Sequence, residues 1–481
     1  MDASTLASTP HAESWGVPDT PTVPTHPSFY SHSRFHSQGR SSLRRLAFLS
    51  ACALVALAGC ASGGSGDSSA SASAQVSPRQ MNGVFEPLVA QSALEDPHEN
   101  VCTDLSLPFE IIAMHASDRA CELSPSGQSQ ASSVDEKWTL GGDFRQIPSL
   151  PIDSSEVFGS STHDPNDLYS YKPAILTPQG TRDLSADLLR EDGNYVEPLD
   201  GTQNGPWITF LGRQVSSSST GDHQEDNVFA PWTIYSWNKN EQRLRTVMTW
   251  SDLPAHSPRS SGELPPVSDG THAFYGAKAS TDHGDFSLII TQGLDDSTRS
   301  EKPQILLFGA YPTVSEQGLS VVATTMNSPL PSRVATLSGT DFSKVTTHFD
   351  LKSQDYRISG LYAAGDHHAV LVTPSRTSST ASSYLGIWND RTTDYPTQWI
   401  MVDSRTPWVS IGEEAIVWGA GSQANNAQMY LRPWETGTIA RLGETPGYSR
   451  PVVAARGHTV MLPRVNSQGG IQWSIGEFTA E

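Results

Sequence analysis

Five glycine-containing turns recur at nearly constant spacing in the second half of the chain, and this periodicity constrains the fold more than any other feature. The glycines are separated by 48, 47, 47 and 45 residues: Gly270, Gly318, Gly365, Gly412 and Gly457. Glycine suits tight turns because it adopts a positive φ without the steric cost of a Cβ atom. A period of roughly 40–50 residues is typical of β-propellers, in which each repeat is one sheet of four short strands.

The segments between these turns have the composition of short β-strands. Runs of roughly five to eight residues rich in Val, Ile, Thr, Trp and Tyr are separated by Gly, Asp, Asn and Ser, and sustained helical periodicity is almost absent after residue 135. The clearest repeat predicts strands at residues 408–411, 415–419, 429–434 and 438–442. Two β-sandwiches in tandem would also give many short strands. The steady period favours a single propeller.

We therefore expect an all-β fold over residues 135–481: one β-propeller of six or seven four-stranded blades. A propeller is normally closed by a sheet that takes strands from both ends of the chain. A strand within residues 173–190 is expected to complete the ring. The frequent tryptophans are expected mainly to fill the space between blades.

The first 60 residues carry the features of an export signal. Arg44 and Arg45 precede an apolar run of thirteen residues, 46–58, which is followed by Gly59 and Cys60. The run is too short to span a bilayer, which needs about 20 residues, but it suits a signal peptide. The sequence L-A-G-C at its end resembles the lipobox of bacterial lipoproteins. That resemblance implies cleavage between Gly59 and Cys60 and a lipid on Cys60.

These features predict that the chain is divided into four parts. Residues 1–59 form a disordered n-region and signal peptide, and residues 60–80 form the lipidated cysteine and a Ser/Gly-rich flexible tether. Residues 81–134 form a short disulfide-bridged segment, and residues 135–481 form the propeller. We expect the mature protein to be anchored by lipid to the outer face of the cell membrane.

Cysteine usage agrees with export. The chain has four cysteines; Cys52 lies in the signal peptide and Cys60 would carry lipid, which leaves Cys102 and Cys121. Exported proteins keep disulfides, so we expect these two to be bonded. Closing a loop of about 20 residues would stabilise the fold by roughly 3 kcal/mol. Residues 106–114, between them, predict a short helix with proline in its first turn.

Residues 135–481 resemble the exported propeller domains of bacterial lipoproteins of the actinobacterial type, such as TolB-like domains. The resemblance is architectural, because the repeated turns carry no paired Gly-His and Trp-Asp motif of the WD40 kind. It implies a propeller body and assigns no residue a function.

Known catalytic motifs are absent from the sequence, including H-E-x-x-H, C-x-x-C, the P-loop, G-x-G-x-x-G and G-x-S-x-G. The candidate ligand residues are therefore those at the repeated turns: Asp269, Asp366, His367 and Glu413. The run from Asp366 to His368 has the residue types of a metal site. Neighbouring histidines on a strand point to opposite sides, however, so we predict no metal and no cofactor.

The balance of acidic and basic residues limits the classes of partner that the protein can bind. Asp and Glu number 51 against 31 Lys and Arg, for a net charge of −20, which argues against nucleic acid as a partner. The leading hypothesis is a non-enzymatic propeller that binds a protein or glycan ligand through its loops. The alternative is a polysaccharide hydrolase or lyase that uses paired carboxylates near the central channel. A transport solute-binding lipoprotein is disfavoured, because that class is α/β and needs long helices.

Overall fold

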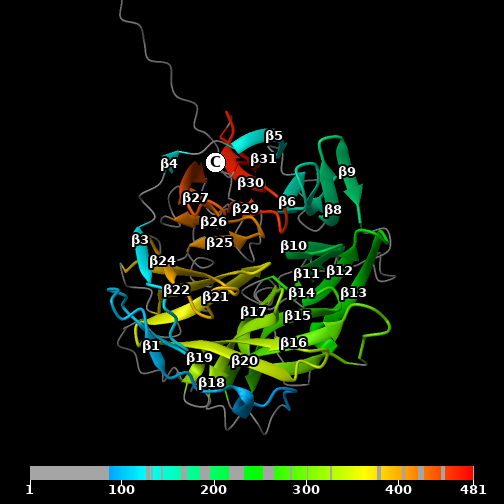
Figure 1. Ribbon diagram of the computed structural model, residues 1–481. Helices are drawn as coiled ribbons and strands as arrows, with labels where there is room; N and C mark the ends of the chain where they lie inside the picture. The colour runs from blue at the N-terminus through cyan, green and yellow to red at the C-terminus, as the bar shows by residue number, and fades with distance from the viewer. Residues whose placement is uncertain are drawn as a thin grey trace, which may run out of the picture.

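In the computed structural model, the described part of the chain consists of β-strands and their connections (Figure 1). Two 3-10 turns, η1 (Gln91–Ala93) and η4 (Trp250–Asp252), are its only helical elements. The all-β prediction is therefore confirmed for these residues. The structure describes residues 86–125, 130–131, 134–141, 145–163, 171–184, 195–215, 232–252, 265–281, 284–300, 302–325, 328–375, 381–403, 407–420, 427–445, 450–467 and 469–479.

Five sheets are separate blades of four or five strands, arranged around a common centre (Figure 1). The four-stranded blades are β6 (Gln146–Pro151), β7 (Val157–Ser161), β8 (Lys172–Thr177) and β9 (Gly180–Asp183); β10 (Tyr195–Asn204), β11 (Trp207–Val215), β12 (Trp232–Asn238) and β13 (Arg243–Thr249); and β29 (Val452–Val453), β30 (Thr459–Val465) and β31 (Ile471–Phe478) with β5 (Val134–Gly141). The five-stranded blades are β21 (Tyr356–Ala364), β22 (His367–Pro374), β23 (Ser383–Asn389) and β24 (Gln398–Val402) with β3 (Glu122–Pro125); and β25 (Trp408–Ile411), β26 (Ala415–Ala420), β27 (Ala427–Pro433) and β28 (Ala440–Thr445) with β4 (Gln130–Ala131). The four strands predicted between residues 408 and 442 are thus confirmed.

The remaining strands form one sheet of nine. Its order is β1 (Glu99–Val101), β2 (Glu110–Ala113), β20 (Lys344–Lys352), β19 (Ser328–Ser338), β18 (Gly318–Thr325), β17 (Gln304–Ser315), β16 (Gly284–Gly293), β15 (His272–Thr281) and β14 (Val267–Ser268). Residues 304–308 of β17 pair with β16, and residues 309–315 pair with β18. The prediction of six or seven separate four-stranded blades is therefore wrong, because one long strand joins two groups of strands into a single sheet.

The innermost strands form a closed cycle around the centre. Each contacts the next in the order β6, β10, β14, β17, β21, β25, β29 and back to β6 (Figure 1). The ring is closed where β5, from the start of the propeller region, pairs antiparallel with β31 from the end of the chain. The predicted closing strand at residues 173–190 is wrong. Residues 172–183 instead form β8 and β9; β8 pairs antiparallel with β7, and β9 pairs antiparallel with β8.

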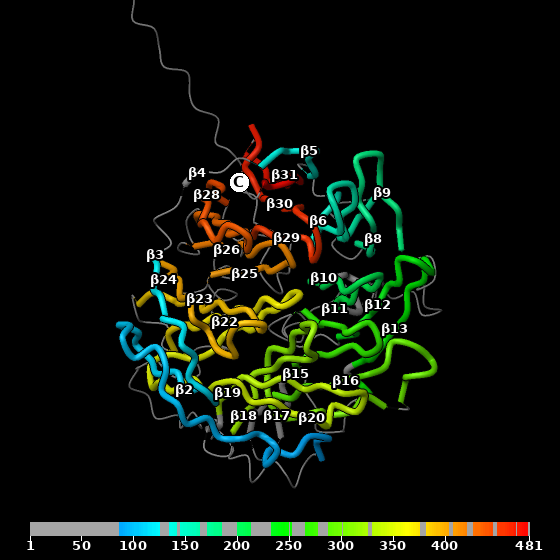
Figure 2. The backbone as a smooth tube through the Cα atoms, in the orientation of Figure 1, coloured from blue at the N-terminus to red at the C-terminus, as the bar shows by residue number. Residues whose placement is uncertain are grey.

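The segment before β5 runs along the outer edges of successive sheets. We call residues 99–125, which contain β1 to β3, the strap; Figure 2 shows it as a blue to cyan tube outside the ring. Strand β2 pairs with β20, and β3 and β4 pair in parallel with β24 and β28. The predicted helix at residues 106–114 is wrong. Residues 110–113 extend the edge of β20 instead, which shows that sheet pairing overrides the local helix signal.

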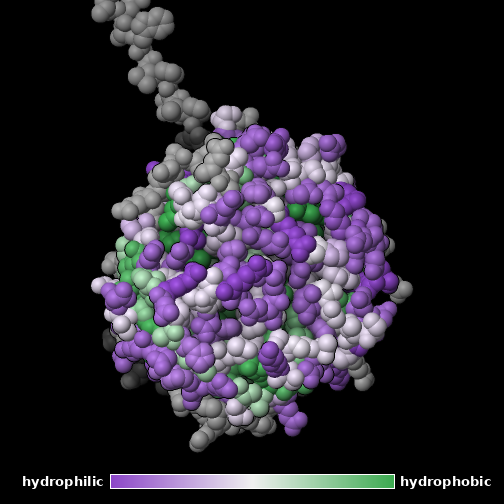
Figure 3. Space-filling model, viewed as in Figure 1, coloured by the Kyte–Doolittle hydropathy of each residue, from purple (hydrophilic) through white to green (hydrophobic). Residues whose placement is uncertain are grey.

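The core lies between the sheets and is rich in aromatic residues. Six of the tryptophans expected there are buried, with at most 3% of their surface exposed: Trp232, Trp237, Trp388, Trp399, Trp418 and Trp473. Each large aromatic ring removes about 150–250 Å² from water, so these side chains contribute much of the stabilisation. On the surface, Figure 3 shows a mainly hydrophilic face with hydrophobic residues in small separate areas.

The disulfide between Cys102 and Cys121 is confirmed, with a Cα–Cα distance of 5.2 Å. The predicted lipidation and cleavage site, Gly59 and Cys60, lies outside the described residues. Within the described part, no helix is both long and apolar enough to cross a membrane.

Candidate functional site

Several of the periodic turns, each between the first and second strand of its repeat, lie side by side. The amide of Glu316 donates a hydrogen bond to the carbonyl of Gly365 (3.1 Å), and the amide of Glu413 donates to the carbonyl of Ala455 (2.9 Å). We use the name "rim" for five charged residues of this row and of one adjoining turn: Glu316, Asp366, Arg391, Glu413 and Arg456. The row is held by main-chain contacts between neighbouring sheets.

At two of the periodic turns, the geometry requires glycine. Gly365 has φ of +57°, which an L side chain rarely adopts, and a Cβ there would lie 3.5 Å from Cγ of Glu413. At Gly412, a Cβ would lie 2.2 Å from the carbonyl oxygen of Ala454 in the next turn. The first glycine is required by the turn and the second by the close approach of two turns.

Ion pairs connect the rim side chains. Arg391 contacts Asp366 (Nε–Oδ2 2.5 Å) and Glu316 (Nη2–Oε2 3.5 Å), and Arg456 contacts Glu413 (Nε–Oε1 2.8 Å). The side chains of Arg391, Arg456 and Glu316 are 69%, 67% and 64% exposed. Exposed ion pairs of this kind contribute only about 0–1 kcal/mol to stability. The rim charges therefore contribute little to the stability of the fold.

The structure brings only some of the sequence candidates together. Asp366 and Glu413 lie in adjoining turns, as the Gly365 contact shows. Asp269, in the β14–β15 turn, instead accepts hydrogen bonds from the amides of Thr271 (2.7 Å) and His272 (2.6 Å). Burial would raise the pKa of Asp269, but the hydrogen bonds from His272 and Thr271 outweigh it and lower the pKa below the ordinary value. Asp269 is thus a turn-stabilising residue.

His367 packs against an aromatic ring beside the rim. Its imidazole stacks on Trp434 with ring centroids 4.4 Å apart and an interplanar angle of 2°. The indole Nε1 of Trp434 donates to the carbonyl of Gly412 (2.9 Å), and the Arg432 guanidinium lies 5.8 Å from its ring centre. Burial lowers the pKa of His367 to about 4, so this imidazole is neutral at pH 7. The stacked pair supports the turns that carry Asp366 and Glu413.

His368 points to the other side of the strand, as predicted for neighbouring histidines. Its Nε2 lies 2.6 Å from Oδ2 of Asp390, and the two side chains are only 2% and 4% exposed. The ring stacks on Trp388 at 4.8 Å. His367 and His368 therefore cannot share one ligand. In the part of the chain that the structure describes, no three His, Cys, Asp or Glu side chains are grouped to hold a metal ion.

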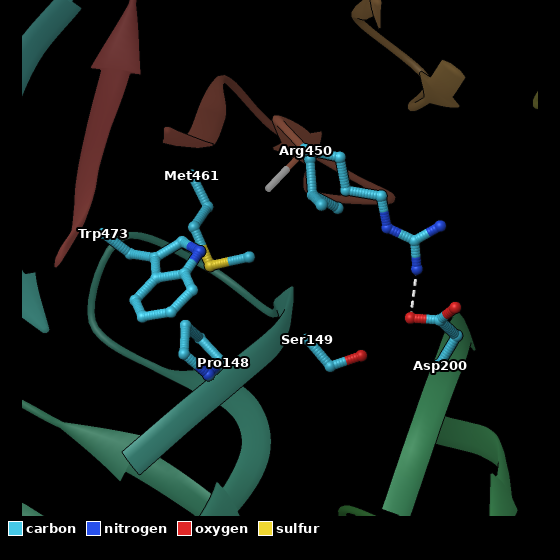
Figure 4. Close-up of a pocket in the computed structure, with 7 residues that line it drawn as sticks. Pro148, Ser149, Asp200, Arg450, Met461 and Trp473 are labelled. Carbon is cyan, nitrogen blue, oxygen red and sulfur yellow. Dashed lines mark ion pairs between the residues drawn. The ribbon is translucent and has the colours of Figure 1, made fainter. Parts of the chain in front are cut away.

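Sequence reasoning missed a second polar feature near the centre of the ring. Arg450 and Asp200 form an ion pair in a small pocket (Figure 4), which is also lined by Pro148, Ser149, Val452, Met461 and Trp473. The cavity measures about 10 Å³, close to the space that one ordered water requires. Its two charged residues are 250 positions apart, and no local motif marks either of them. The pocket is too small for a larger ligand.

Arg391 and Arg456 were also missed. Arg391 follows β23, so it comes from a turn between third and fourth strands, outside the glycine period that identified the candidates. Arg456 immediately precedes Gly457 in the periodic turn before β30. It could have been found from that position together with the opposite charge of Glu413.

No protein-family model and no curated protein matches the chain. Among solved structures it is similar to an oligogalacturonate lyase in complex with manganese, with 8% identity, 80% of this chain and 96% of that chain covered, and a TM-score of 0.42. An oligogalacturonate lyase from Vibrio parahaemolyticus gives 9% identity, 79% and 96% coverage, and a TM-score of 0.40. TolB from Acinetobacter baumannii gives 11% identity, 59% and 81% coverage, and a TM-score of 0.29. At these scores, the likeness carries no inference about ligand or reaction. The chain's own topology makes it a β-propeller, with the rim as its candidate site.

Proposed function

We propose that this protein is an exported β-propeller, anchored to the outer face of the membrane by lipid on Cys60, that binds a protein or glycan of the cell envelope through the rim and catalyses no reaction. The basic pair, short apolar run and L-A-G-C sequence support the anchor. The Ser/Gly-rich residues 60–80 would form a tether with a root-mean-square length of about 25 Å. That length would let the propeller stand clear of the lipid headgroups.

The observation that carries the binding role is the row of exposed charges on a fixed backbone. Arg391 and Arg456 are both about two-thirds exposed, although each has a carboxylate partner. Hydrogen bonds between neighbouring turns hold the main chain beneath them, so binding would cost little main-chain conformational entropy. Arginine presents five donors in a rigid fork, which suits carboxylate or phosphate groups of a partner.

The same contacts favour binding over hydrolysis. A glycosidase needs two carboxyl groups placed across a scissile bond, one as an acid and one as a base or nucleophile. Asp366 and Glu413 are instead each oriented by a different arginine, and Asp269 is oriented by backbone amides. All three candidate carboxylates thus have structural partners of their own.

The anchor is tested by expressing the full chain in a bacterial host and measuring the mass of the N-terminal peptide. We expect a mature protein that begins at Cys60, carries acyl chains and sediments with the membrane. Cys60→Ser should leave the protein without acyl chains and release it from the membrane fraction. An unmodified Cys60 in the membrane-associated protein would contradict the anchor, and Cys52→Ser serves as the matched control.

The binding role is tested with the double variant R391E/R456E of the full chain. The control is Arg441→Glu, on the outer strand β28. Wild type, the rim variant and the control are each immobilised, and we compare how much purified envelope glycan and envelope protein each retains. The proposal predicts that the rim variant loses at least 10-fold in retention while the control does not. Equal retention by all three proteins would contradict it, as would turnover of a retained glycan.

A further inference from the structure

The disulfide joins two different sheets at the outer circumference of the ring. Cys102 directly follows β1, which belongs to the nine-stranded sheet. Cys121 directly precedes β3, which pairs with β24 of the neighbouring blade. The bond therefore closes the strap across the boundary between these two sheets.

Inside that closed loop, Phe109 occupies an aromatic socket. Its ring centroid lies 5.7 Å from that of Tyr356, 5.4 Å from that of Tyr384 and 5.2 Å from that of Trp399. Phe109 is 7% exposed, so the neighbouring blade surrounds it almost completely. The strap thus attaches to this blade by a single large side chain as well as by backbone pairing.

Backbone pairing attaches the strap to an edge strand of each of the two sheets. Residues 110–113 of β2 pair with β20, and residues 122–125 of β3 pair with β24. The amide of Ser117 donates to the hydroxyl of Tyr395 (3.0 Å) between these two attachments. An uncovered sheet edge exposes unpaired backbone groups, so the strap protects both edges.

The two sheets do not depend on the strap for their contact with each other. Strand β21 of the blade contacts β17, β18 and β19 of the nine-stranded sheet directly. Without β3, the blade still has β21 to β24, and the ring is closed elsewhere by β5 and β31. The contacts that close the ring are therefore made without the strap.

The two cysteine residues differ in exposure. Cys121 is buried, with 8% of its surface exposed, whereas Cys102 is partly exposed. An external dithiol would attack Sγ of Cys102 as a thiolate, with the Cys121 thiolate as leaving group. The second thiol of the reagent then closes its own disulfide and releases Cys102; two electrons and two protons pass from the dithiol to the protein.

We propose that the Cys102–Cys121 disulfide is a redox-sensitive clasp: its reduction by a dithiol frees the strap and uncovers the outer edge of β24 and the aromatic socket that Phe109 fills, without opening the ring. A loop of this size contributes roughly 3 kcal/mol of closure entropy. That corresponds to a roughly 10²-fold increase in the opening constant of the strap after reduction.

Hydrogen exchange measured by mass spectrometry on the full chain tests the proposal. Oxidised protein is compared with protein reduced by dithiothreitol in native buffer, with alkylation to verify two free thiols in the strap. We expect exchange of residues 99–125 and of the β24 edge amides to rise roughly 10²-fold. Exchange of β26, in the next blade, should stay constant.

A double variant, C102S/C121S, separates the clasp from effects of the reagent. It should exchange like the reduced protein and should not respond further to dithiothreitol, while the control Cys52→Ser should respond like wild type. Unchanged strap protection in protein with two alkylated strap cysteines would overturn the proposal. Equal loss of protection in β26 would also overturn it, because the ring would then unfold together with the strap.

Discussion

A buried histidine makes the stability of this fold depend on pH below neutrality. His348 lies on β20 and is 6% exposed; its Nε2 is 2.7 Å from the Thr336 hydroxyl, which is 2.8 Å from that of Ser320. The other ring nitrogen, Nδ1, has no hydrogen-bond partner. Burial, and to a smaller extent the neighbouring His368, lower the pKa of His348 to about 4 from 6.5.

The direction in which the free energy of unfolding changes with pH follows from proton uptake by His348. The folded pKa lies below the unfolded one, so between about pH 6.5 and pH 4 the unfolded chain binds more protons than the folded chain. The free energy of unfolding therefore falls as the pH is lowered through this window. A difference of 6.5 − 4 = 2.5 pKa units corresponds to about 3 kcal/mol, lost fully only below pH 4.

Urea unfolding of the full chain at pH 7, 6, 5 and 4 measures this loss. Other groups also titrate, so the informative quantity is the difference between wild type and His348→Gln, which has no imidazole to protonate. Between pH 7 and pH 4 the wild type should lose up to about 3 kcal/mol more than the variant. The exposed His98→Gln serves as the matched control and should follow wild type. An equally steep pH dependence in His348→Gln would refute the reasoning.

Three further substitutions test the packing. In the oxidised protein, in which the Cys102–Cys121 bond holds the strap on the ring, Phe109→Ala should lower the free energy of unfolding by about 3–5 kcal/mol, and Phe109→Leu by less, as measured by urea unfolding; equal effects would contradict the aromatic socket. Gly412→Ala should lower the melting temperature, because its Cβ would meet the carbonyl of Ala454 at 2.2 Å; an unchanged value would show that the two turns can separate freely. Arg333→Met should lower the free energy of unfolding by about 3–5 kcal/mol, because the carboxylate of Asp350 would lose the cation with which it forms a buried ion pair. An unchanged urea midpoint would contradict that pairing.

The sequence predicted the parts of the fold that depend on local pattern. Alternating apolar residues and regular turns located the strands between residues 408 and 442, because each hairpin is determined by its own residues. The same pattern could not reveal that β17 is one strand of twelve residues that pairs with β16 along its first part and with β18 along its second, because pairing partners are not encoded in the strand's own residues. Ring closure by β5 and the strand at residues 110–113 depend on partners more than 200 positions away, which no local signal specifies.

In the candidate site, too, the sequence predicted some residues and missed others. Asp366 and Glu413 were found because equivalent turns of successive repeats meet at one end of the ring. Arg391 was missed because it comes from a different class of turn, and the Arg450–Asp200 pair was missed because it joins distant repeats. Opposite charges at equivalent turns of successive repeats can be recognised in a sequence as a possible ion pair. An ion pair between turns of different kinds can be recognised only in the structure.

The rim depends on a closed ring, because closure keeps the neighbouring turns that form it side by side. Asp135 of β5 and Glu477 of β31 lie directly opposite each other, and Lys137 contacts both carboxylates (2.7 and 3.2 Å). The most direct measurement is the yield of the disulfide in the D135C/E477C variant, identified by peptide mass mapping of the native protein. A closed propeller predicts near-complete formation of the bond between residues 135 and 477. Free thiols at both positions under oxidising conditions would contradict the ring and, with it, the rim.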